Sequence, residues 1–366
     1  MAGSLMESAP AAETVIDGKR YLYFGGTGYF SLQNHPTLLQ VTAEALTRYG
    51  MHSATWRGGF GTTPLYVGVE RKAAEFFGTE DAAYIASGYL SNIAGFQALA
   101  ATAKLDAVFF DEGSHYSLTD FVHLLQSPAV AFAHAEPEDL RQKLRMHLRA
   151  GQRALVVSDG VFPLMGQVAP VPAYIEVSAP YEASIWLDDA HGVGVLGANG
   201  RGTYEHHGLA SDRLLFGGTL SKAFGSYGGI IPGTTRFIQT IRTGHVMNGA
   251  TSPTSSAAAW ALASMELLTQ HPEWRTQLRD NAWRLKAGLR QMGVAIADSP
   301  VPIAAWTLSS SEQMDRIQKE LMDRGICIQR AYYPGAGTGG VLRVVVFSSH
   351  TAEQIDRLLG ELKSLI

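Results

Sequence analysis

Residues 81–132 read DAAYIASGYLSNIAGFQALAATAKLDAVFFDEGSHYSLTDFVHLLQSPAVAF, and this stretch decides the class of fold. Short apolar segments that predict β-strands alternate in it with helical patterns. We expect the strands at 81–87, 106–111 and 129–134, and the helices at 88–100 and 117–125. Strands that alternate with helices are typical of a largely parallel sheet that is covered on both faces. The stretch therefore predicts an α/β fold.

The same alternation continues on both sides of this stretch. Toward the C-terminus, the pattern predicts helices and strands in turn, at 137–150, 153–160, 171–179, 184–190 and 212–219. Toward the N-terminus, a D-G turn between two apolar segments predicts a hairpin at 15–24. Helical spacing follows at 36–49 and 67–78, and Gly78 is expected to end the second helix.

The pattern changes in the last third of the chain. Two long helical patterns run through 255–268 and 273–292. A smaller α+β unit follows, with apolar strand-like segments, the helix 312–325 and the final segment 350–366. We therefore expect three parts, which are an N-terminal arm at 1–45, a large domain at 46–275 and a small C-terminal domain at 276–366.

Composition excludes several classes of protein. Of 366 residues, 46% are hydrophobic and 17% are charged, which is typical of a compact globular protein rather than a disordered chain. The formal net charge is -4, and no basic run is long enough to follow a nucleic acid backbone. The sequence also lacks a membrane-spanning apolar stretch and a signal-peptide pattern at its start, so we expect a cytoplasmic protein.

One cysteine, Cys327, is present, so an internal disulfide framework is excluded. Its neighbours in GICIQ are mostly apolar. This setting favours a buried structural thiol over a nucleophile. No metal site is expected.

In open α/β sheets, ligands bind at the carboxyl ends of the strands, so polar residues that follow predicted strands are candidate site residues. Five clusters of this kind are present, at 87–89, 111–115, 158–166, 188–191 and 217–222. One of them overlaps a misleading motif. Gly192, Gly194 and Gly197 match G-x-G-x-x-G after a strand, but more glycines follow where a dinucleotide site needs a helix. We therefore do not expect a nicotinamide cofactor.

Lys222 lies among glycines and small residues in GGTLSKAFGSYGG, whereas a solvated lysine normally lies on a polar helix face. Partial removal from water disfavours the ammonium form and leaves more free amine to attack an aldehyde. Taken alone, this setting also suits a lysine whose stem packs on the turn while its head reaches water.

The residues around Lys222 match the needs of one cofactor. Pyridoxal phosphate (PLP) requires a lysine for its Schiff base, a carboxylate at the pyridine nitrogen, a stacking group and donors for its phosphate. Asp188 and His191 follow one predicted strand, and His115 follows another. Ser87 and the two residues after it open a helix, whose N-terminus can bind a phosphate through its N–H groups.

At these positions the chain resembles the α-oxoamine synthases, which are PLP enzymes of fold type I. The family joins an amino acid to an acyl-CoA with loss of carbon dioxide. The most specific matches are LDDAHGVGVLGANGRG at 187–202 and GGTLSKAFGSYGG at 217–229. Further matches are IASGYLSN at 85–92, FFDEGSHYSL at 109–118 and LRVVVFSSHTAEQID at 342–356. The resemblance covers nearly all of the chain from about Asp17.

The resemblance implies a catalytic role for four residues. Lys222 would form the Schiff base and, once released, remove the substrate's α-proton. Asp188 would pair with the pyridine nitrogen, and His191 would contact the phenolic oxygen of the cofactor. His115 would stack on the ring.

The resemblance also assigns binding roles. Ser87, Gly88 and Tyr89 would border the phosphate-binding turn, and Thr219 would donate to the phosphate. Arg343 would bind the substrate's carboxylate, for which its planar fork is well suited. The family further implies a homodimer in which both subunits complete each site.

Several positions differ from the family pattern. Pro163 stands where a serine is expected to touch the phenolic oxygen, Met165 replaces an acid, and Tyr66 replaces a histidine. In 248–254 the usual threonine pair is out of register, and Thr251 or Ser252 can substitute for it.

The resemblance therefore implies an acyltransferase that makes an α-amino ketone from a small amino acid and an acyl thioester, with acyl-CoA as the candidate donor. Two alternatives stay open. The first is other α-carbon chemistry without a thioester, as in an aminotransferase, racemase or aldolase. The second is a non-catalytic relative, against which the intact set of Lys222, Asp188, His191 and His115 argues.

Overall fold

The computed structural model describes residues 4–102, 104–149, 151–209, 214–333 and 335–366. The chain forms two compact units. The larger unit comprises Pro36–Phe162 and Val168–Gln270, and the smaller comprises Met1–His35, Pro163–Gln167 and His271–Ile366. The expected boundaries at 45/46 and 275/276 stay predictions.

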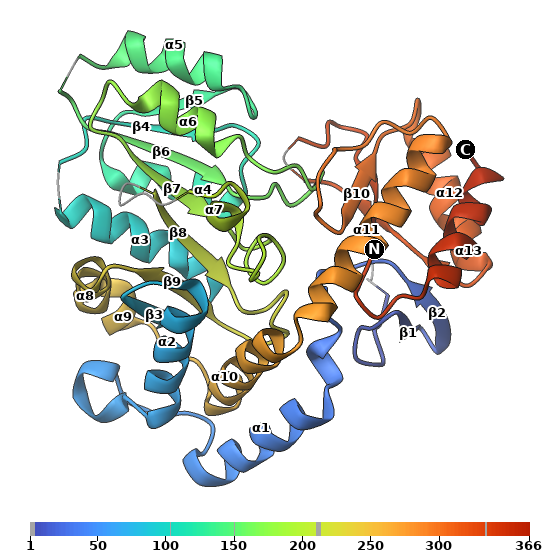
Figure 1. The fold of residues 1–366 in the computed structure, drawn as a ribbon, viewed down its shortest axis with the longest axis horizontal. Helices are drawn as coiled ribbons and strands as arrows, with labels where there is room; N and C mark the ends of the chain where they lie inside the picture. The colour runs from blue at the N-terminus through green and yellow to red at the C-terminus, as the bar shows by residue number, and fades with distance from the viewer. Residues whose placement is uncertain (1–3, 103, 150, 210–213, 334) are drawn as a thin grey trace. The chain divides into compact units, whose positions relative to one another are not determined.

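A seven-stranded sheet forms the centre of the larger unit (Figure 1), in the order β3-β9-β8-β7-β6-β4-β5. The strands β4 to β8 run parallel, and β9 pairs antiparallel with both β3 and β8. The strand bounds are β3 Asp81–Ile85, β4 Ala107–Asp111, β5 Ala129–Phe132, β6 Ala154–Asp159, β7 Ser184–Asp188, β8 Leu214–Thr219 and β9 Gly229–Gly233.

Helices cover both faces of this sheet, as the sequence predicts. Leu155 and Val157 of β6 pack in a core that α3 (Gly88–Thr102) and α8 (Thr235–Thr243) also line. On the opposite face, Phe132 of β5 contacts Tyr174 of α6 (Val171–Ser178). Side chains alternate between the faces of a strand, so apolar residues along the whole of β6 serve both cores. The remaining helices of this unit are α1 Pro36–Tyr49, α2 Pro64–Phe77, α4 Tyr116–Thr119, α5 Pro137–His147, α7 Thr203–His206, α9 His245–Gly249 and α10 Ser255–Gln270, with short turns η2 Arg57–Gly61 and η3 Val122–Leu125.

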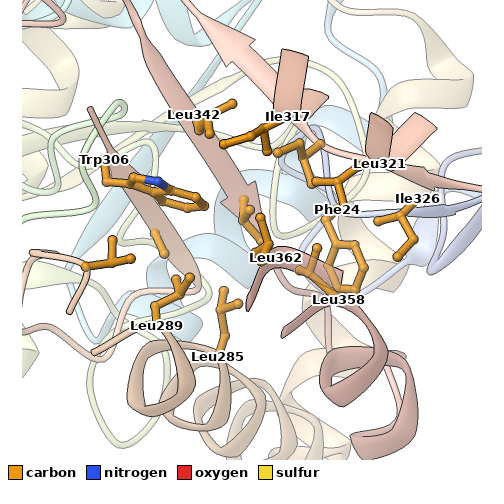
Figure 2. Close-up of a cluster of buried hydrophobic side chains, with 14 of the residues drawn as sticks. Phe24, Leu285, Leu289, Trp306, Ile317, Leu321, Ile326, Leu342, Leu358 and Leu362 are labelled. Carbon is orange, nitrogen blue, oxygen red and sulfur yellow. The ribbon is translucent and has the colours of Figure 1, made fainter. Parts of the chain in front are cut away.

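The smaller unit has a core of its own. Figure 2 shows Trp306 and Leu342 packed with leucines of α11 (Pro272–Gln291) and α13 (Ala352–Lys363). Its two small sheets have the orders β1-β2-β11 and β10-β13-β12. The other bounds are β1 Glu13–Ile16, β2 Lys19–Tyr23, η1 Leu32–Asn34, β10 Ile303–Trp306, α12 Ser311–Asp323, β11 Ile326–Cys327, β12 Gln329–Ala331 and β13 Val341–Val345.

The predicted helix at 117–125 is wrong as a single element. The segment is divided into α4 and η3. The division occurs at Phe121, because its N–H donates to the carbonyl of Leu118, three residues earlier, and not to the residue four earlier as in an α-helix. Leu118, Val122 and Leu125 still face one core, so the apolar spacing indicates the buried face but not the continuity of the helix.

Several elements were not predicted, among them β9, α8 and α9. The strand β9 reads GIIPG, and glycine and proline normally argue against a strand. Pro232 is tolerated because the β8 ladder ends at Ile230, so no bond from residue 232 to β8 is needed.

Parts of two predicted elements lie outside the described residues, at position 150 and at 212–213. Among the helices that the structure describes, none is both long and apolar enough to cross a membrane.

Candidate active site

A cavity of about 210 Å³ lies in the larger unit at the carboxyl ends of the parallel strands. It is lined by all eight residues predicted for cofactor binding, which are Ser87, Gly88, Tyr89, His115, Asp188, His191, Thr219 and Lys222. The residues come from the ends of β3, β4, β7 and β8, as expected for ligands of open α/β sheets. Asp159 and Ser221, which belong to predicted clusters but had no assigned role, also line the cavity, and so does Ser117, which was not predicted.

Asp188 is held by donors on both of its oxygens. Its Oδ2 accepts from Asn92 Nδ2 at 2.7 Å and from the Ser117 hydroxyl at 3.3 Å, and its Oδ1 accepts from Ala190 N–H at 3.0 Å. Asn92 is fixed in turn, because its Oδ1 accepts from Trp186 Nε1 at 2.8 Å. Donors of this kind fix the orientation of a carboxylate.

His115 is positioned by the same network. Its Nδ1 accepts the N–H of Ser117 at 3.0 Å and lies 2.7 Å from the Ser117 hydroxyl. Burial lowers the pKa of His115, although the Asp188 carboxylate opposes this effect, so the neutral ring is favoured. A neutral imidazole is suited to stack against an aromatic ring. The backbone N–H of His115 donates to Asp159 Oδ2 at 2.8 Å, and this bond fixes the backbone of His115.

Asp159 is a second buried carboxyl group beside Asp188. The two residues are direct neighbours in the register of β6 and β7. Burial and the Asp188 carboxylate raise the pKa of Asp159 well above its ordinary value, and Lys222 opposes this effect. Like charges this close disfavour double ionisation, so the protonated form of Asp159 is favoured.

Lys222 lies half-buried in the tight turn that follows β8. The turn is fixed by backbone hydrogen bonds from Gly225 N–H to the Lys222 carbonyl and from Ser226 N–H to the Leu220 carbonyl. The charge of Lys222 acts on the pKa values of both His115 and Asp159. The amine is therefore close to the groups with which it is predicted to act.

The start of α3 and the end of β8 form a cradle for an anion. A Cβ on Gly88 would come within 2.6 Å of Thr219 Cβ, so only glycine lets the helix start approach this strand. The hydroxyls of Thr219 and Ser221 lie 2.8 Å apart. A helix N-terminus with hydroxyl donors beside it is suited to bind a phosphate.

Asp189, the neighbour of Asp188, has a structural role. Its carboxylate accepts from the N–H and the hydroxyl of Thr203 at 2.7 and 2.6 Å. A Cβ on Gly192 or Gly202 would lie 2.0 Å from this carboxylate. These glycines therefore make room for a buried side chain, and no described helix begins at the G-x-G-x-x-G motif.

We expect Asp189→Asn to change how stability depends on pH. Burial raises the pKa of Asp189 to about 7, above its ordinary value of 3.8. The folded state therefore retains a proton that the unfolded state loses, so this contribution to stability is lost as pH rises from about 4 through about 7. Asparagine has no proton to lose, so the substitution removes this decrease in the free energy of unfolding, which amounts to up to about 4 kcal/mol. Urea unfolding of the wild type and of Asp189→Asn at pH 5 and pH 8 measures this effect. If the two proteins differed in free energy of unfolding by the same amount at both pH values, the prediction would be contradicted.

Arg343 lies in β13 of the smaller unit and is only 6% exposed. Its Nε donates to the carbonyl of Pro163 at 3.2 Å, and its Nη1 donates to Gln329 Oε1 at 2.8 Å and more weakly to the Gly26 carbonyl at 3.5 Å. The proline that replaces the expected serine thus contributes its backbone carbonyl. Burial lowers the pKa of Arg343.

The other positions that differ from the family pattern have structural contacts. Tyr66 is buried and donates its hydroxyl to the carbonyl of Pro253 at 2.7 Å. Met165 packs against a small apolar cluster around Leu164 in the smaller unit. Burial raises the pKa of Cys327 to about 11, which disfavours the thiolate and agrees with a structural thiol. Among the described residues, no cluster of His, Cys, Asp and Glu could hold a metal ion.

Comparison with known proteins identifies the family. The model of aminotransferase class I and II matches residues 26–362. The 8-amino-7-oxononanoate synthase of Alkaliphilus oremlandii is 31% identical, over 99% of this chain and 91% of that protein. The synthase of the same name from Thermosipho melanesiensis is 32% identical, over 98% and 92%. A serine palmitoyltransferase from S. paucimobilis, solved with a bound PLP-myriocin aldimine, superimposes with a TM-score of 0.92 at 29% identity and covers 99% of this chain and 92% of that one.

These matches span nearly the whole chain and confirm the predicted resemblance and class of fold. The chain belongs to the aminotransferase class I and II family and, within it, to the α-oxoamine synthases of fold type I.

Proposed function

We propose that the protein is a PLP-dependent acyltransferase that condenses a small amino acid with an acyl thioester and releases carbon dioxide. The observation that carries this proposal is the presence of Lys222, Asp188 and His115 in one cavity beside a phosphate cradle. The product is an α-amino ketone. The relatives that match over nearly the whole chain are named as synthases and as a palmitoyltransferase. Chemistry at the α-carbon without a thioester is therefore not favoured.

The residues of the cavity fit PLP. The amine of Lys222 would hold the aldehyde carbon, and Asp188 would pair with the pyridine nitrogen. His115 offers a neutral ring for stacking, and Thr219 and the start of α3 offer donors for the phosphate. When bound, the cofactor supplies a cationic ring that accepts electron density from the substrate's α-carbon.

The side chains have separate tasks in the reaction. Lys222, as a free amine, accepts the α-proton of the amino acid and acts as the general base. Asp188, whose carboxylate is oriented by three donors, would pair with the pyridine nitrogen and favour its protonated form. Arg343 binds the substrate's carboxylate until that group leaves as carbon dioxide. A carbon–carbon bond forms at the α-carbon while the carbon–sulfur bond of the thioester breaks and the thiol leaves.

The test is the release of thiol. We expect the purified protein with PLP to release free thiol only when an amino acid and an acyl-CoA are both present, in amounts equal to the carbon dioxide formed. Glycine, alanine and serine should be tested, each with acyl chains of different length. Turnover of an amino acid in the absence of any thioester would contradict the proposal.

We also propose that the protein forms a homodimer, as the family resemblance implies. What supports this is the exposure of large apolar residues in one loop of the larger unit, where Trp56 and Phe60 are 53% and 98% exposed. Exposed aromatic residues are enriched at protein interfaces. Light scattering coupled to gel filtration tests the proposal, and a monomer at micromolar concentration would contradict it.

A further inference from the structure

Two arginines with little exposed side-chain surface have carboxylate partners, whereas no carboxylate of the described residues pairs with Arg343. In the larger unit, Arg57 makes two hydrogen bonds to Glu70, at 2.6 and 3.0 Å. In the smaller unit, Arg330 on β12 pairs with Asp315 at 2.8 Å. The side chains of Arg57 and Arg330 are 13% and 5% exposed, and Arg343 is 6% exposed. The hydrogen-bond acceptors of Arg343 within the described residues are nevertheless all neutral. Burying a cation without a counter-ion costs free energy, so such a cation is expected where an anionic ligand supplies the counter-ion.

Gln329 is the side chain that orients this arginine. Gln329 and Arg343 are direct cross-strand neighbours in the pairing of β12 with β13, so their side chains leave the same face of the sheet. The bond between them, 2.8 Å from Nη1 to Oε1, is the shortest that the guanidinium makes. The carbonyl of Pro163 holds Nε on the other side. Among the described residues, Nη2 has no hydrogen-bond partner.

The chemistry of a glutamine suits this place. Its amide oxygen accepts a hydrogen bond and fixes the plane of the guanidinium, as a carboxylate would, but it brings no negative charge. A glutamate would form a stronger, charge-assisted pair with Arg343 and would compete with any carboxylate that approaches. An apolar residue of the same length would leave the charge available but would not fix its direction.

We propose that Gln329 is a positioning residue for the amino acid substrate, which turns Arg343 toward the substrate's carboxylate without neutralising it. This inference rests on the proposed function, because it needs an amino acid substrate that Arg343 binds. It predicts selectivity for a free carboxylate over a carboxamide. That selectivity depends on Gln329 as well as on Arg343.

The test is a binding titration of the PLP-loaded protein, followed by the absorbance of the bound cofactor. The ligands are the amino acid that gives the largest change with the wild type and the carboxamide of the same amino acid. We expect Gln329→Glu to raise the Kd of the amino acid about tenfold or more and to leave the Kd of the carboxamide within about twofold. Gln291→Glu, the same exchange at an exposed residue of α11, should change neither value.

Two further variants keep the test decisive. Arg343→Ala should remove the preference for the carboxylate altogether, and Gln329→Met, which keeps the length but not the acceptor, should reduce it about threefold to tenfold. If Gln329→Glu does not fold, as judged by thermal melting, Gln329→Met decides the question. An unchanged ratio of the two Kd values in a folded Gln329 variant would overturn the inference while leaving the proposed function intact. No absorbance change with any amino acid in the wild type would overturn both.

Discussion

Lys222→Ala is expected to fold and to bind PLP but to lose exchange of the substrate's α-proton. The reason is that no other amine in the cavity can accept this proton, since Lys222 is the one lysine among its described lining residues. A positioned general base contributes about 10²- to 10⁴-fold to a rate, so exchange should fall by at least that factor. Proton NMR of the amino acid in deuterated water measures the exchange directly, without requiring a thioester.

A control separates this effect from a general loss of lysine charge. Lys104 is exposed and lies outside the cavity, so Lys104→Ala should exchange at the wild-type rate. The turn after β8 is held by backbone hydrogen bonds, and the substitution keeps them, so the melting temperature of the Lys222 variant without PLP should stay close to that of the wild type. Exchange at the wild-type rate in Lys222→Ala would show that another group is the base.

Local signals were sufficient to predict most of the fold. The hairpin at the N-terminus follows from a D-G turn, and both residues of that turn, Asp17 and Gly18, have the positive φ values that it requires. The apolar runs predict the parallel strands because both faces of such strands are buried. The strand β9 could not be predicted, since its glycines and Pro232 are tolerated only because of where the β8 ladder ends.

The site residues that could be predicted are those at the carboxyl ends of predicted strands. Asp188 is the last residue of β7 and Lys222 follows β8, so their placement at one edge follows from the parallel sheet alone. The supporting residues depend on spatial relations that one sequence does not express. Asp159 lies beside Asp188 through the register of β6 and β7, and Asn92 donates to Asp188 although the two residues are 96 positions apart in the chain. Only the spacing of Asn92 from Gly88, one helical turn, hinted that both face the same way.

Asp188→Asn is expected to weaken PLP binding and to slow α-proton exchange by about 10²-fold or more. An amide cannot hold the proton of the pyridine nitrogen as a carboxylate does, so the ring becomes a poorer acceptor of electrons. The protein's own contacts add to the effect. Both oxygens of Asp188 face donors, namely Asn92 Nδ2 and Ser117 on one side and Ala190 N–H on the other. The NH₂ group of an asparagine must therefore oppose one of these donors or face the cofactor.

The neighbouring residue supplies the matched control. Asp189 is also buried and lies directly after Asp188, the last residue of β7. It accepts two hydrogen bonds from Thr203, whereas Asp188 accepts three from the network of Asn92, Ser117 and Ala190. Asp189→Asn should therefore alter the pH dependence of stability while PLP affinity, measured by equilibrium dialysis, and proton exchange remain near wild-type values. If the two variants lost PLP and exchange to the same extent, the effect would come from a disturbed strand end, and the role assigned to Asp188 would be wrong. If only Asp188→Asn lost them, the charge at this one carboxylate would account for the loss.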